Sequence, residues 1–388
     1  MKIRGRALVL AVSLPVIVFA VVGGFMSKAI ARQDSYQYLR IFEDVISLIL
    51  QNYVEEVNVD KVMHGAMHGL ADGLDPDSAY LDPAQVKVLD KGDTGGAGET
   101  GLELTRQYYL RVIAARDGSP AAKAGLMPGD YIRAIDGQST RDTTVYEGQR
   151  LLRGKPGTKV HLTVLRGNAV EPHEIDLVRE GLTSPPVKSR MAAPGVGYLR
   201  VAEFGKSTPE QLKNEISSVS KAGAKSVIID LRGTAFGDLD AGIAAARLFV
   251  KSGVLAYRQD RGKEKEAVNA AAGDGSIALT TVLLTDNGTS SGAEVFAAAL
   301  SGNKRAQLIG ERTLGRAARQ KLVRLPDGSG LMLTHLIYMT PASVAIHEKG
   351  LVPDVPVEQP DVDFGQPPAA TDATLDKAIA SLTTKAAA

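Results

Sequence analysis

Residues 281–300 read TVLLTDNGTSSGAEVFAAAL, a short apolar run followed by small turn residues and then by a helical pattern. We expect a strand at Thr281–Thr285 and a helix at Ala293–Leu300. The same order recurs upstream, where we expect two further strands and two further helices, at Val196–Val201, Ser226–Leu231, Pro209–Ala222 and Ala241–Val250. Strands that alternate with helices are typical of an α/β core with parallel strand pairs.

The regions that precede this core have other patterns. Asp34 to about Leu89 carries apolar residues near the helical period, which predicts a helical segment. Leu102–Gly167 predicts short strands separated by turns, among them Tyr109–Ala114 and Lys159–Val164, with a helix at Val145–Leu152.

Two stretches have the composition of irregular structure. Gly92–Gly101 is rich in glycine and predicts a flexible joint or loop. Pro360–Ala388 is rich in proline, alanine and threonine and predicts a loose tail, with one helix at Thr374–Leu382 as the alternative. The expected fold class is α/β, with an N-terminal helical segment, a domain of short strands and a core of alternating strands and helices.

Composition excludes several classes of function. Over 388 residues the chain has 45 basic and 44 acidic side chains, and nucleic-acid-binding domains usually carry a basic surplus. Cysteine is absent, so thiol catalysis, disulfides and cysteine-based zinc sites are excluded. No H-E-x-x-H zinc motif and no G-x-x-x-x-G-K-[ST] phosphate loop occurs. We therefore expect no nucleic acid partner, no metal and no cofactor.

The first 31 residues have the pattern of an export segment. Lys2, Arg4 and Arg6 precede an uncharged apolar run from Ala7 to Met26, and Ala29-Ile30-Ala31 offers the small residues that signal peptidase accepts. Both a cleaved signal peptide and an uncleaved membrane anchor fit this pattern, and a buried core helix is the third interpretation. The first two interpretations place the rest of the chain on the extracytoplasmic side of a membrane.

An ordered run of turn and apolar residues resembles a PDZ domain. Residues 119–132 read SPAAKAGLMPGDYI, and they follow the loop Gly101-Leu102-Glu103-Leu104. They are followed by AIDG at residues 134–137 and RGKPGT at residues 153–158. The resemblance implies that the backbone of residues 101–104 receives the terminal carboxylate of a peptide, whose chain adds a strand to the domain's edge. Unfolded or C-terminal segments of proteins are then the expected partners, although a PDZ domain can also serve as a lid.

A larger part of the chain, most of residues 40–358, resembles the carboxy-terminal processing (tail-specific) peptidases, a family of serine peptidases with a PDZ domain and a serine–lysine pair. Residues 74–81 read LDPDSAYL, where the family reads LDPHSxYL, and residues 350–354 read GLVPD, where it reads G(I/L)xPD. Together with the residue patterns described above, the resemblance divides the chain into five expected parts: a signal or anchor at 1–31, a helical region at 32–90, a PDZ domain at 98–170, a serine peptidase-like core at 180–358 and a flexible tail at 359–388.

The resemblance also implies a nucleophile. The family has a run of small residues that ends in glutamate, G-S-A-S-A-S-E, and this chain has Gly288 to Glu294 there, which puts Ser291 at the nucleophile position. A serine at the start of a helix lies beside free backbone donors and the positive end of the helix dipole. The structural alternative is that Thr289, Ser290 and Ser291 only cap the helix.

The position of the family's base holds a different residue. The family reads G-K-G-x-x-Q, and residues 315–320 read GRAARQ, so Arg316 stands in place of the lysine and Gln320 in place of the glutamine that orients it. A buried lysine can give up its proton and then accept one from serine. A guanidinium keeps its proton in proteins and cannot act as a general base.

A second departure affects the oxyanion hole. After an Asp-Leu-Arg sequence the family has N-x-P-G-G, whose glycine backbone helps to build the oxyanion hole, and residues 233–237 here read GTAFG. Gly237 is kept, and Phe236 replaces the other glycine. Losing one oxyanion donor typically costs about 10²–10³ in rate. Lys321, His335 and His347 are the other basic side chains considered as a base for Ser291.

Three functions are therefore considered: a binding protein, an active peptidase and a purely structural assembly protein. The first is a family member that binds unfolded or C-terminal segments through its PDZ domain, with proteolysis impaired or lost because of Arg316 and Phe236. Such a protein would act with an active peptidase or an adaptor as its partner. The alternative is an active serine endopeptidase that uses Ser291 and another base.

Overall fold

The protein is described from a computed structural model that covers residues 36–167, 171–360, 362–366 and 371–387. The chain divides into two compact units, Met1–Gly69 and Leu70–Ala388. In the described part of the first unit, residues 36–52 form a helix, and α2 (Val59–Asp72) begins after a short connection. The expected signal or anchor at 1–31 lies outside the described residues. Among the helices described, none is both long enough and apolar enough to span a membrane.

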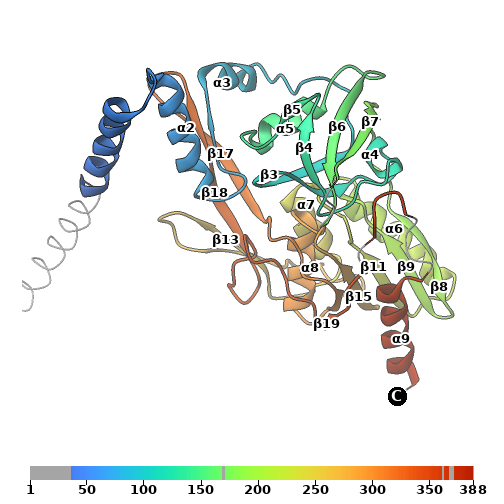
Figure 1. Ribbon diagram of the computed structural model, residues 1–388. Coiled ribbons are helices and arrows are strands. Elements are labelled where there is room, and N and C mark those ends of the chain that lie inside the picture. The colour runs from blue at the N-terminus through green and yellow to red at the C-terminus, as the bar shows by residue number, and fades with distance from the viewer. Residues whose placement is uncertain (1–35, 168–170, 361, 367–370, 388) are drawn as a thin grey trace, which may run out of the picture. The chain divides into compact units, whose positions relative to one another are not determined.

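The core of the second unit is a six-stranded sheet in the order β19-β16-β15-β11-β9-β8. The strands are parallel except β8, which is antiparallel to β9. Their bounds are β8 (Lys188–Ala193), β9 (Val196–Arg200), β11 (Ser226–Asp230), β15 (Thr280–Thr285), β16 (Ala306–Gly310) and β19 (Val355–Pro356). The predicted strands 196–201, 226–231 and 281–285 lie in this sheet, so the expected α/β core is confirmed (Figure 1).

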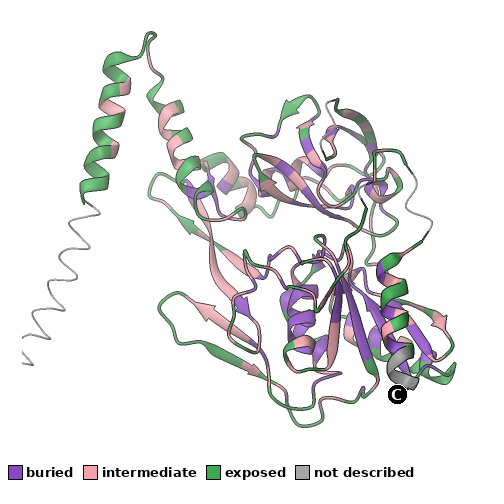
Figure 2. Cartoon of the chain, turned by 60° about the horizontal axis from the view of Figure 1, so that its bottom comes forward, coloured by how far each residue is buried: buried purple, intermediate pink, exposed green. Residues whose placement is uncertain are grey.

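Helices cover both faces of this sheet. Leu199, Ile229 and Leu283 pack in one cluster with α6 (Thr208–Lys221), α7 (Leu239–Ala246) and α8 (Gly292–Gly302). The neighbouring residues along the strands, such as Ile228 and Val282, face the other way and pack on α9 (Ala373–Ala387). Successive side chains of a strand point to opposite faces, so a strand buried on both faces is apolar throughout. Figure 2 shows this sheet and α8 as largely buried.

Within the expected flexible tail at 359–388, the alternative of one helix at Thr374–Leu382 describes α9, so this part of the segment is not a loose tail. Ala378 and Leu382 are buried against the sheet, and the carboxylate of Asp372, just before the helix, forms a two-point ion pair with Arg232. Alanine and threonine gave this segment the composition of a loose tail, but alanine also has the highest helix propensity.

A second, antiparallel sheet was not predicted. It has the order β1-β18-β13-β14, and β17 pairs with β18. Its strands are β1 (Ala79–Leu81), β13 (Val254–Asp260), β14 (Glu266–Asn269), β17 (Ala318–Arg324) and β18 (Gly330–Met339). The region 32–90, expected to be helical, thus contributes the strand β1 to the peptidase-like core, followed by α3 (Pro83–Asp90) with a capping box between Asp82 and Gln85.

The PDZ domain is a sheet in the order β2-β3-β4-β6-β7, with β5 on β4. Its elements are β2 (Leu102–Gln107), β3 (Tyr109–Ala115), α4 (Pro120–Lys123), β4 (Tyr131–Ile135), β5 (Gln138–Ser139), α5 (Val145–Leu152), β6 (Lys159–Leu165) and β7 (His173–Val178). The expected end at residue 170 is too early, because β7 pairs along β6 and Glu180 bonds to Glu99. Gly98 and Glu99 are held by these backbone bonds, so the second half of the expected joint at 92–101 is fixed to the domain.

Candidate active site

Ser291 lies at the turn between β15 and α8, with a backbone that side chains rarely adopt. Its φ is 57° and its ψ is −126°. Strained backbone of this kind persists only when the surroundings hold it, and it clusters at functional sites. The amide of Ser291 donates to the carbonyl of Arg316 at 3.2 Å, and the amide of Ser290 donates to the carbonyl of Thr234 at 3.0 Å. The Ser291 side chain makes no capping hydrogen bond to α8, so the helix-capping interpretation does not describe this residue.

Gly292, the residue after Ser291, lies too close to neighbouring atoms to carry a side chain. A Cβ atom on Gly292 would lie 2.5 Å from the carbonyl oxygen of Asp238 and 2.9 Å from the ring-bearing Cβ of Phe204. Only glycine fits there without displacing backbone. The close approach brings the start of α8 against Asp238 and Phe204. Phe204 belongs to β10 (Glu203–Phe204), which runs parallel to β12 (Phe236–Gly237).

Glu294, in the first turn of α8, fixes the backbone of the segment that carries Arg316. Its carboxylate is fully buried and accepts hydrogen bonds from Thr313 Oγ1 at 2.5 Å, Gly315 N at 2.6 Å and Arg316 N at 2.7 Å. Burial raises the pKa of Glu294 to about 7, although these hydrogen bonds oppose the shift. The sequence motif identifies this glutamate only as the end of the run of small residues and does not predict its role in positioning residues 313–316.

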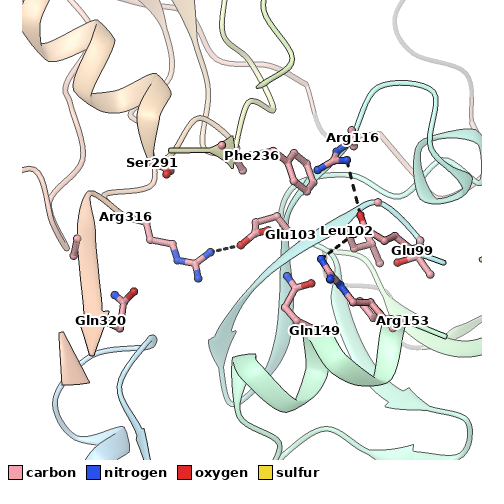
Figure 3. A pocket seen from close by; sticks show the side chains of 16 residues that line it. Glu99, Leu102, Glu103, Arg116, Gln149, Arg153, Phe236, Ser291, Arg316 and Gln320 are labelled. Carbon is pink, nitrogen blue, oxygen red and sulfur yellow. Dashed lines mark hydrogen bonds and ion pairs between the residues drawn. The ribbon is translucent and has the colours of Figure 1, made fainter. Parts of the chain in front are cut away.

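The Arg316 guanidinium is engaged with two carboxylates. Its Nε donates to Asp77 Oδ2 at 2.8 Å, its Nη2 lies 2.7 Å from Asp77 Oδ1, and its Nη1 donates to Glu103 Oε1 at 2.6 Å. Figure 3 shows the side chain extending toward Glu103. Burial disfavours the charged guanidinium, but Asp77 and Glu103 outweigh it and raise the pKa of Arg316 further above its usual range. Arg316 therefore joins the N-terminal part of the unit, the core and the PDZ domain.

Gln320 lies on β17 but has its own partner. Its Nε2 donates to Thr334 Oγ1 at 3.1 Å on the neighbouring strand β18. Ala318 and Gln320 line the cavity at Ser291, whereas Lys321, the residue that follows Gln320 on the strand, is exposed. His335 and His347 are not among the residues that line this cavity.

One cavity of about 340 Å³ brings the two predicted sites together. On the PDZ side it is lined by Gly101, Leu102 and Glu103, and on the core side by Gly237, Ser291 and Gln320 (Figure 3). Leu104, the fourth residue of the predicted peptide-binding run, is not among the lining residues: its side chain is buried in the PDZ core and its carbonyl accepts from Arg316 Nη1 at 3.3 Å. The segment expected to receive a peptide's carboxylate, at residues 101–103, and Ser291 thus line a single cavity.

Phe236 fills the boundary between the PDZ domain and the core. It is 8% exposed and packs with Ile113 and Ala114 of β3, and the guanidinium of Arg116 lies 4.5 Å from its ring centre. Gly237 has a φ of 111°, and a Cβ atom there would lie 2.1 Å from the carbonyl oxygen of Phe204. Residue 237 must therefore be glycine. The aromatic side chain of Phe236, one residue earlier, packs the PDZ domain against the core.

Comparisons with known proteins match this arrangement. The chain matches peptidase family S41 over residues 195–357 and a PDZ domain over residues 111–166. It is 31% identical over 361 residues to the carboxy-terminal-processing protease of Bartonella bacilliformis, covering 89% of this chain and 83% of that protein. It is 32% identical over 315 residues to the carboxy-terminal processing protease CtpA of Bacillus subtilis, covering 81% and 67%.

A solved structure agrees with these matches. The photosystem II D1 C-terminal processing protease superimposes with a TM-score of 0.68 at 29% identity, and the match covers 80% of this chain and 85% of that one. The expected combination of a PDZ domain and an α/β peptidase core is confirmed by this similarity.

Proposed function

Because the chain belongs to the carboxy-terminal processing proteases of peptidase family S41, with a PDZ domain, we propose that it binds unfolded or C-terminal protein segments and that its proteolysis is impaired or lost. The cavity that Gly101, Leu102 and Ser291 share supports the binding part of the proposal. The family supplies the class of ligand, a protein segment with an accessible end.

The ion pairs of Arg316 carry the proposal that proteolysis is impaired. A serine nucleophile needs a neighbouring group that accepts its proton. The resembled motif has a lysine at this position, and the guanidinium that replaces it is held by Asp77 and Glu103 in its protonated form. The surrounding charges therefore stabilise the state that cannot accept a proton from Ser291.

The other bases considered do not compensate. Lys321 is exposed on β17, and the residues that line the cavity at Ser291 include neither His335 nor His347. Phe236, in place of a glycine, puts a ring beside the backbone that the family uses for its oxyanion hole. A base and an oxyanion hole contribute separately to the rate, so two defects reduce it further.

An active serine endopeptidase that uses Ser291 and another base is the second candidate function. The strained backbone of Ser291 and its place in the cavity favour this candidate. The two candidates differ in turnover and agree on the ligand.

The location proposed for the binding protein is extracytoplasmic. The positive flank and apolar run of residues 1–31 support either secretion or a membrane anchor. An active peptidase or an adaptor on the same side of the membrane is the proposed protein partner.

The binding part is tested with the full-length chain and a fluorescein-labelled, alanine-rich decapeptide that has a free carboxyl terminus. Fluorescence anisotropy should detect saturable binding, and the same peptide with an amidated terminus should bind more weakly. Mass spectrometry of the mixture should recover the peptide intact. No binding at millimolar peptide would contradict the proposed function.

A further inference from the structure

The strand β2 is the free edge of the PDZ sheet. It pairs with β3 on one side, and no strand of the described residues pairs with its other side. A peptide that adds to such an edge must hydrogen-bond to the outward amides and carbonyls of the strand. Along residues 102–104 those outward groups are the carbonyl of Leu102, the amide of Leu104 and the carbonyl of Leu104.

These groups already have partners within the chain. The side-chain amide of Gln149, on α5, lies between them, and we assign its oxygen and nitrogen from these neighbours, which puts the nitrogen 3.3 Å from Leu102 O and the oxygen 3.0 Å from Leu104 N. The opposite orientation of the amide would put oxygen against oxygen and N–H against N–H. The third group, Leu104 O, accepts from Arg316 Nη1 at 3.3 Å.

A glycine lets α5 come close enough for this contact. A Cβ atom on Gly148 would lie 2.3 Å from one Leu110 methyl and 3.3 Å from one Leu104 methyl, so the helix rests directly on the strands. A primary amide carries one N–H donor group and one carbonyl acceptor, as a peptide unit does. The Gln149 side chain therefore makes the pair of bonds with β2 that one peptide unit of a ligand would make.

Gln149 also stands where two cavities meet. It lines the cavity at Ser291 and a neighbouring cavity of about 300 Å³ whose walls include Leu89, Tyr146 and Arg150. Glu103 and Arg153 line both cavities too. A segment that follows the edge of β2 from Ser291 into the second cavity must displace the Gln149 amide.

We propose that Gln149 is an internal competitor for the peptide groove, and that displacing its amide from Leu102 and Leu104 sets the affinity for an added strand. The proposal rests on the proposed function, because it concerns how the same groove takes up a protein segment. Binding exchanges two side-chain hydrogen bonds for two backbone hydrogen bonds and releases the glutamine side chain.

The test compares the full-length chain with its Gln149→Ala variant. Without bound peptide, hydrogen exchange at the Leu104 amide should be faster in Gln149→Ala, because the side-chain oxygen that accepts from this amide is gone. The labelled decapeptide described above should bind about 3- to 10-fold more tightly, the value of roughly one net hydrogen bond. Gln138→Ala is the matched control, since Gln138 is exposed on β5 of the same domain.

The two readouts separate this proposal from the proposed function. Faster exchange at Leu104 with tighter peptide binding supports the competitor role. Unchanged exchange overturns it, as does weaker peptide binding by Gln149→Ala, which would make the amide a ligand contact. Faster exchange with no peptide bound by either protein supports the occupied groove and overturns peptide binding as the function.

Discussion

The guanidinium of Arg316 and the carboxylate of Asp77 form a two-point ion pair although 239 residues separate them in the chain. Asp77 is 5% exposed at its side chain and Arg316 is 22% exposed. Both positions depart from the motifs that the chain resembles, which have histidine in LDPHSxYL and lysine in GKGxxQ. The charges of Asp77 and Arg316 compensate each other, so the two substitutions relative to the motifs are structurally linked.

Restoring the lysine should not restore full activity. In Arg316→Lys the new ammonium group would lie beside Asp77 and Glu103, which favour its charged form, and Phe236 would remain. We expect at most partial hydrolysis of unfolded casein by this variant. Adding Asp77→Asn should increase the rate at least about tenfold, since removing one adjacent charge makes neutral lysine more abundant. Full cleavage by Arg316→Lys alone would contradict the roles given to Asp77 and Phe236.

The Arg316–Asp77 pair should show strong thermodynamic coupling. Asp77→Asn and Arg316→Gln are each expected to lower the free energy of unfolding by about 2–4 kcal/mol, because each leaves a largely buried charge with fewer partners. The double variant should lose less than the sum, with a coupling energy of about 1–3 kcal/mol in urea unfolding. The exposed pair Arg324–Asp90 is the control, with coupling of about 0–1 kcal/mol. Additive losses at Arg316 and Asp77 would rule the coupling out.

Phe236 should contribute to stability through the PDZ–core boundary. Phe236→Gly removes a buried ring and its contact with Arg116, so urea unfolding should show a loss of about 3–5 kcal/mol. Tyr108→Gly is the control, because Tyr108 is 79% exposed and has a φ of 66°, which glycine adopts readily. A loss below about 1 kcal/mol for Phe236→Gly would mean that the ring does not support the boundary.

Glu294 should make stability depend on pH. Its pKa of about 7 in the folded protein exceeds the ordinary 4.5, so the folded state binds the proton more tightly. The resulting stabilisation is complete below about pH 4.5 and is lost as the pH rises through about 7, with a magnitude of about 3 kcal/mol. Glu294→Gln should remove this decline from the unfolding free energy, whereas the exposed Glu210→Gln should keep it. If the unfolding free energy of Glu294→Gln still declined between about pH 4.5 and 7, groups other than Glu294 would cause the decline.

Local pattern was enough to predict the parts of the fold whose burial is regular. The helix Val145–Leu152 has its predicted bounds, and β11 and β15 lie within one residue of theirs, because strands buried on both faces are short continuous apolar runs. The position of Ser291 at the start of a helix could be predicted because its motif is contiguous.

The pairing of strands that are far apart in the sequence could not be predicted from local pattern. The strand β17 reads ARQKLVR and is only partly buried, so it has no continuous apolar run, and β1 pairs with β18 across more than 240 residues. The contacts of Arg316 with Asp77 and Glu103 likewise depend on the assembled fold. The sequence shows that a lysine motif has changed, and the three-dimensional arrangement shows which carboxylates hold its replacement.

Impaired proteolysis is tested most directly by the rate at which the full-length chain cleaves permanently unfolded casein, measured beside its Ser291→Ala variant. We expect that both proteins, folded by circular dichroism, give the same rate as buffer or differ only marginally. Rapid cleavage by the native chain that disappears in Ser291→Ala would contradict it, because Ser291 would then have an efficient base that is not Arg316.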